Sequence, residues 1–170
     1  MDNGLEAIVE IILLLFFLGL MLVPFLAFFI YVFFQNNKRK NIRQRAQTQY
    51  GQMIGSGGAV PVRYCSERRF RNWFKIFPWE GAGLLVPTQG VVTFVGENLN
   101  GTPLNFQFMR DNSVLQWMGK CPWPNGAVSW FSIDNQGQKH YFTSETGAFV
   151  FGSNNSTREA FAQTQRSFTS

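Results

Sequence analysis

A run of 24 residues without a charged side chain, Ile11 to Phe34, limits what this chain can fold into more than any other feature. The run holds seven of the 19 phenylalanines, and a water-soluble helix of that length would keep a polar face. As a helix it would be about 36 Å long, slightly more than the roughly 30 Å hydrocarbon core of a bilayer. It therefore predicts a transmembrane helix over residues 11–34. Such a composition excludes a purely soluble enzyme, a multi-span transporter and a disordered tail.

A cleaved signal peptide is the alternative reading of this run. Signal peptides have an apolar stretch of about 7–15 residues behind a positively charged start. Here the stretch is longer, and Asp2, Glu6 and Glu10 precede it. We therefore expect an uncleaved anchor with a short acidic flank over residues 1–10.

The charges on either side of the run predict its orientation. The cations that follow it are Lys38, Arg39, Lys40, Arg43 and Arg45. Basic flanks stay in the cytoplasm, so we expect the N-terminus outside and the C-terminal domain in the cytoplasm. Each basic residue close to the surface would also attract anionic headgroups by about 1 kcal/mol, which makes these five predicted membrane-surface residues.

The rest of the chain divides into a linker and one domain. Residues 35–59 are polar, first basic and then rich in glycine, and the first half of this linker can continue the membrane helix. Residues 60–170 are numerous enough for one compact domain with its own core. Apolar stretches of strand length are found at 81–86, 91–95, 104–108, 114–118, 127–133, 139–143 and 148–151. The turn sequences between them predict seven antiparallel strands, and residues 60–64 are a candidate additional strand.

Two segments of the domain show helical spacing. Ser156-Thr157-Arg158-Glu159 has the pattern of a capping box, which predicts a C-terminal helix beginning at Ser156. Ala160, Phe161 and Phe168 would share one face of that helix and close one end of the sheet. A second, shorter helix is predicted over residues 70–77.

Two hairpin segments resemble a known family. Residues 80–94, EGAGLLVPTQGVVTF, look like the first hairpin of GRAM-type and bacterial pleckstrin-homology-like domains, and residues 131–142, FSIDNQGQKHYF, resemble their late hairpin. The resemblance implies a seven-stranded antiparallel barrel closed by a C-terminal helix, acting as a binding module and not as an enzyme. Phosphoinositide-binding members place cations in the first hairpin loop. Residues 87–90 contain none, which favours protein binding or scaffolding.

The domain offers no residue pattern for catalysis. The single histidine, His140, lies in a predicted strand, the acids are scattered, and neither a GxSxG elbow nor a phosphate-binding loop is present in the sequence. Cys65 and Cys121 are isolated, which favours buried thiols in a reducing compartment over a zinc site. We therefore predict no catalytic residue, no metal and no cofactor, and expect His140 to be a surface residue or a hydrogen-bonded structural one.

Residues 68–75, RRFRNWFK, interleave four cations with three aromatic residues. Rings and cations in this pattern suit the interface of a bilayer with anionic headgroups. The predicted membrane-surface residues here are Arg68, Arg69, Arg71, Trp73 and Lys75. In the alternative, Trp73, Phe74 and Phe77 pack into the barrel and the arginines are solvated. Nucleic acid is not an expected partner, because a tethered domain has lipid nearby.

The loop at residues 121–126, CPWPNG, holds Trp123 between two prolines. A tryptophan on a constrained loop is a predicted protein contact, although it could instead fold back over the sheet. Together the patterns predict a single-pass, noncatalytic scaffold or recruitment module with a protein partner and the bilayer. The alternative function is a lipid- or small-ligand-binding accessory protein of a membrane enzyme complex.

Overall fold

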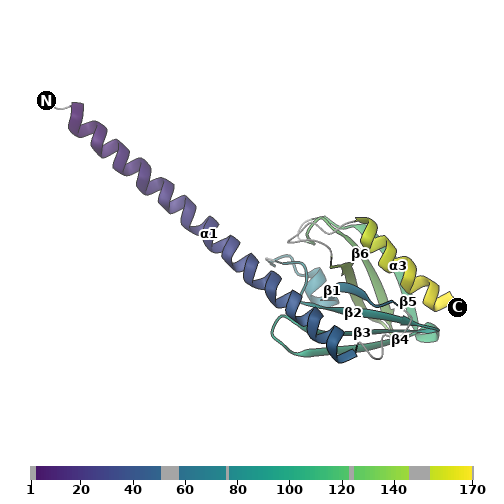
Figure 1. Cartoon of the computed structure of the whole chain (residues 1–170). Coiled ribbons are helices and arrows are strands. Elements are labelled where there is room, and N and C mark those ends of the chain that lie inside the picture. The colour runs from purple at the N-terminus through teal and green to yellow at the C-terminus, as the bar shows by residue number, and fades with distance from the viewer. Residues whose placement is uncertain (1–2, 51–57, 76, 123–124, 146–153, 170) are drawn as a thin grey trace. The chain divides into compact units, whose positions relative to one another are not determined.

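The computed structural model describes residues 3–50, 58–75, 77–122, 125–145 and 154–169 (Figure 1). The chain forms two compact units, Met1–Asn36 and Asn37–Ser170. Helix α1, Asn3–Tyr50, contributes to both, because its residues 37–50 belong to the second unit. The predicted continuation of the apolar helix into the basic segment is confirmed. The second compact unit therefore includes residues 37–50 of α1 together with the β-rich part of the chain.

The apolar run lies in one uninterrupted helix. Pro24 is inside α1 and does not end it. The large apolar side chains of the run, such as Leu14 and Phe16, are exposed on all sides of the helix. Among the described residues, α1 is the one helix long and apolar enough to cross a membrane.

The second unit is an antiparallel half-barrel of seven strands. They are β1 (Val60–Ser66), β2 (Gly81–Thr88), β3 (Val91–Asn98), β4 (Pro103–Met109), β5 (Ser113–Lys120), β6 (Ser129–Asn135) and β7 (Gln138–Ser144). Their order in the sheet is β4-β3-β2-β1-β7-β6-β5, so β4 and β5 are its edges. The predicted fold class is confirmed, with the candidate strand at 60–64 as β1. The strand predicted at 148–151 lies outside the described residues.

The inner face of the half-barrel is filled with aromatic side chains. Tyr64 stacks on Phe94 with ring centroids 5.4 Å apart, and Phe142 contacts both Phe94 and Phe131. Gly83 and Gly96 face each other across β2 and β3. A Cβ atom on Gly83 would lie 2.2 Å from the Val95 carbonyl oxygen and 2.9 Å from the Phe94 ring. Glycine is therefore required where the strands and this ring approach most closely.

Helix α3, Asn154–Thr169, packs against the half-barrel through small residues. Its buried positions are Thr157, Ala160, Thr164 and Ser167. Phe161 and Phe168 pack against the core beside them, as predicted. The predicted starting residue is wrong, because the helix begins at Asn154 and Ser156 already lies in its first turn.

The helix predicted over residues 70–77 is shorter and earlier than expected. Helix α2 spans Glu67–Arg71, and the Ser66 side chain caps it by accepting a hydrogen bond from the Arg69 amide. A single three-residue 3-10 helix, Arg110–Asn112, connects β4 to β5. Residues 72–75 and 77–80, the described part of the chain between α2 and β2, are not helical.

Candidate functional site

Around the central strand β1, the outer face of the sheet is buried under a second layer of the protein. Neighbouring residues of a strand point to opposite faces, so Val62 and Tyr64 of β1 enter the inner core while Arg63 and Cys65 face outward. Both outward side chains are nevertheless completely buried. The layer around them includes Phe77 and Trp79, which are almost fully buried. Ile42 and Ala46, on the C-terminal segment of α1, are buried as well.

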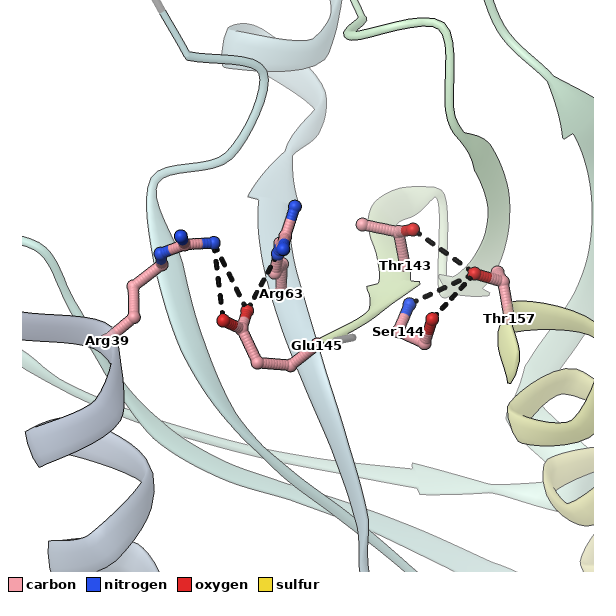
Figure 2. Close-up of polar contacts among 6 residues, drawn as sticks. All are labelled: Arg39, Arg63, Thr143, Ser144, Glu145 and Thr157. Atoms are coloured by element: carbon pink, nitrogen blue, oxygen red, sulfur yellow. Dashed lines mark hydrogen bonds and ion pairs between the residues drawn. The ribbon is translucent and has the colours of Figure 1, made fainter. Parts of the chain in front are cut away.

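A buried cluster of charges lies in this outer layer (Figure 2). Glu145 directly follows β7 and accepts a hydrogen bond from Arg63 Nε at 2.8 Å. Its other carboxylate oxygen lies 3.3 Å from Nη1 of Arg39 on α1. Both guanidinium groups lie against the Trp79 ring, with Cζ to centroid distances of 4.3 Å for Arg63 and 4.8 Å for Arg39. One carboxylate and one indole thus stabilise two arginines.

The energetics of this cluster depend on its pairing. The side chains are only 2% exposed in Arg39, 0% in Arg63 and 7% in Glu145, so water screens them weakly. Removing one partner of a buried ion pair typically costs about 3–5 kcal/mol, because a desolvated charge is left behind. Cation-π contact with a desolvated tryptophan adds about 2 kcal/mol. The cluster therefore fixes the end of α1 to the sheet.

A second feature is the connection between β1 and β2, in which the buried side chain of Lys75 binds backbone carbonyl groups. Lys75 Nζ donates to the carbonyl oxygens of Arg69 and Phe70 at 2.9 Å each, and it also donates to Asn125 Oδ1. Burial lowers the pKa of Lys75, while these acceptors favour its charged form. The Phe70 ring stacks on Tyr141 with centroids 3.9 Å apart. Lys75 and Phe70 therefore tie the described part of this connection to the rest of the domain.

The other side of the same connection faces solvent. Trp73 is 66% exposed and Phe74 is 89% exposed. Arg68 and Arg71 are exposed beside them, and Arg71 pairs with Glu67 at 2.7 Å. We call these four residues, Arg68, Arg71, Trp73 and Phe74, the tip. The alternative that Trp73 and Phe74 pack into the barrel does not describe the structure, although Phe77 is buried.

The structure thus separates the predicted membrane-surface residues into two groups. Arg39 and Lys75 use their charges inside the domain, and Arg69 is half-buried with its guanidinium donating to the Phe77 carbonyl. Lys38, Lys40 and Arg45 are exposed, and Arg43 is half-buried. Arg45 forms an ion pair with Glu97 at 2.8 Å. The predicted protein contact, Trp123, lies outside the described residues.

His140 is part of the inner core. It is buried, and its Nδ1 lies 3.2 Å from the Tyr64 hydroxyl among the rings of Phe106 and Phe108. Of the two positions expected for it, on the surface or in the interior, the structure has the interior one. Cys65 and Cys121 are free, buried thiols, and burial raises the pKa of Cys65 to about 12. Within the described ranges, no three histidine, cysteine or acidic side chains gather in a group that could hold a metal ion.

The position of the first hairpin differs from the one that the resemblance implied. Residues 80–94 form β2 and β3, because β1 precedes them. The connection between the first two strands is therefore the segment that carries the tip, and the loop without cations at 87–90 is the next one along the chain. No protein-family model, no curated protein and no solved structure matches this chain. A functional proposal for this chain therefore rests on the geometry of its domain.

The buried cluster predicts an order of stabilities for three substitutions. Glu145→Gln leaves two buried arginines facing each other and should lower the free energy of unfolding by about 3–5 kcal/mol. Arg39→Met should cost less, about 2 kcal/mol, because Glu145 keeps Arg63. Arg45→Met is the matched control on the same helix and should cost at most about 1 kcal/mol, because its pair is exposed. Denaturant unfolding of the detergent-solubilised chain measures all three, and equal effects for Arg39 and Arg45 would contradict the assignment.

His140 predicts how stability depends on pH. Burial lowers the pKa of His140 below its usual value of 6.5, so the unfolded imidazole takes up a proton before the folded one does. Stability should therefore be fully present above about pH 6.5 and should fall as the pH drops below it. His140→Gln keeps a partner for the Tyr64 hydroxyl and should reduce this slope between about pH 7 and 5. An unchanged slope in thermal unfolding would show that other groups cause it.

Proposed function

We propose that this chain is a single-pass, membrane-anchored, noncatalytic recruitment module with a cytoplasmic pleckstrin-homology-like domain. Seven antiparallel strands followed by a packed C-terminal helix are compatible with that family resemblance. The apolar part of α1 has the length and composition of a membrane anchor. Lys38, Lys40 and Arg45 follow it as exposed cations, which supports the cytoplasmic orientation.

The tip is the single observation that carries this proposal. Two large aromatic side chains are held in water on the connection between β1 and β2, although burying such rings would be favourable. Lys75 and Phe70 hold the connection against the rest of the domain, so the fold itself keeps Trp73 and Phe74 exposed. Rings flanked by the cations Arg68 and Arg71 match the interface of a bilayer with anionic headgroups. The tip would hold the domain against the membrane and leave its other surfaces for a protein partner.

The alternative, a carrier of a lipid or small ligand, needs space inside the half-barrel. The inner face is instead packed with rings such as Phe94, Phe108 and Phe142, all fully buried. Close-packed protein interiors leave few voids larger than a water molecule. This packing favours recruitment at the surface over storage of a ligand in the core.

The orientation can be tested by chemical labelling. Asn100→Cys introduces a thiol at an exposed turn, and the native cysteines are both buried, so background labelling should be low. A membrane-impermeant maleimide should label this variant only after the cells are opened. The unsubstituted chain is the control. Labelling in intact cells would place the domain outside and overturn the cytoplasmic assignment.

The role of the tip can be tested with the full chain in liposomes. An environment-sensitive fluorophore on Phe74→Cys should report an apolar surrounding in vesicles of phosphatidylcholine mixed with phosphatidylglycerol, and high salt should weaken this signal. Val114→Cys is the matched control, because Val114 is 68% exposed on the edge strand β5 and should stay in water. Arg68→Gln with Arg71→Gln should reduce the membrane-bound fraction of the tip.

Two results would count against the bilayer as partner of the tip. The first is a Phe74 probe that is as hydrated as the Val114 probe at low salt. The second is protection of the Phe74 probe in native membranes but not in protein-free vesicles, which would assign the tip to a protein contact.

A further inference from the structure

Three consecutive residues at the end of β7 contact two different helices. Thr143 and Ser144 contact α3, whereas Glu145 contacts Arg39 on residues 37–50 of α1, the docking segment (Figure 2). The backbone amide of Glu145 also donates to the Pro61 carbonyl at 3.0 Å, which ties this point to β1. The strand end thus lies between the docking segment and α3 and contacts both. We call residues 143–145 the junction.

Three contacts on the α3 side meet at one hydroxyl group. Thr157 Oγ1 accepts a hydrogen bond from the Ser144 amide at 3.2 Å. It also lies 3.0 Å from Ser144 Oγ and 3.3 Å from Thr143 Oγ1. Thr157 itself is 1% exposed, so water cannot replace these contacts while α3 is packed. Two of the contacts that hold Ser144 therefore come from α3.

The contacts on the α1 side determine the position of the next residue. Glu145 is held by two guanidinium groups, and the one from Arg63 belongs to the sheet itself. Because Arg63 stays paired when Arg39 leaves, the docking segment can separate without leaving the carboxylate unpaired. Glu145 would then keep Arg63 and the Pro61 carbonyl as partners, one residue away from the contact of Ser144 with α3. The two helices thus share one short, buried stretch of chain.

We propose that the junction is a conformational coupling device: docking of residues 37–50 of α1 and packing of the N-terminal half of α3 stabilise each other through residues 143–145. A change at the anchor end of the domain would then alter α3, which covers the inner core. This inference does not depend on what the tip binds. Coupling of this kind is reciprocal, so a disturbance of either helix must loosen the other.

Hydrogen exchange of the full chain in nanodiscs tests the device. Arg39→Met should raise the exchange rate of amides 158–164 in α3 by about threefold or more, the size expected for contacting residues in one network. Thr157→Val removes the shared hydroxyl and should raise exchange in residues 40–49 of α1 by a similar factor. Arg45→Met and Thr157→Ser are the matched controls, because the first breaks only an exposed pair and the second keeps the hydroxyl.

The amides of β3 are the internal reference, because a rise there would report opening of the whole domain. The proposal is supported if both substitutions raise exchange across the junction through openings that depend less on denaturant than exchange in β3 does, while both controls leave exchange there unchanged. It is overturned if Arg39→Met loosens only α1 and Thr157→Val loosens only α3. It is also overturned if the rise across the junction has the same denaturant dependence as exchange in β3, because that would assign it to opening of the whole domain.

Discussion

The pairing of Glu145 with two buried arginines is the interaction on which the outer layer of this domain depends. Arg63 points out of the middle of the sheet and is completely buried, a position that a cation tolerates only with a partner. Glu145 supplies the negative charge and Trp79 supplies a ring surface for both guanidinium groups. Without that pairing, Trp79 and the apolar residues of the docking segment would cover an isolated charge. The second layer forms because the charge beneath it is neutralised.

Strand β1 belongs to two cores at once, which explains its position at the centre of the sheet order. Its even-numbered residues Val62 and Tyr64 pack among the inner rings, and its odd-numbered residues Arg63 and Cys65 are buried by the outer layer. The edge strand β4 is different, because every second residue there is exposed. A strand that is buried on both faces has no alternation of polar and apolar residues. This is why β1 is weak in the sequence pattern although it is fully integrated in the fold.

The sequence predicts the elements of this protein better than their contacts. The apolar run, the alternation at 104–108 and the turn sequences identify the long helix and most strands, because each signal is local. The buried cluster has no such signal: Arg39 and Glu145 are 106 residues apart, and Glu145 is one scattered acid among ten acidic residues. The tip is an intermediate case. Its cations and rings are visible in the sequence, but nothing local distinguishes Lys75, which points inward, from Arg71, which points outward.

In the basic segment after the anchor, the periodicity of the α-helix separates the buried cation from the exposed ones. Arg39, Ile42 and Ala46 are spaced three and four residues apart, so they lie on one face of a helix, and all three are buried. Lys38, Lys40 and Arg45 lie on the remaining surface and are exposed. A cation that shares a face with apolar residues therefore belongs to the protein interior, whereas cations on the other faces remain available to headgroups. The number of basic residues gives the sign of the net charge of this segment. The face of the helix on which each cation lies determines whether it binds inside the domain or can face lipid.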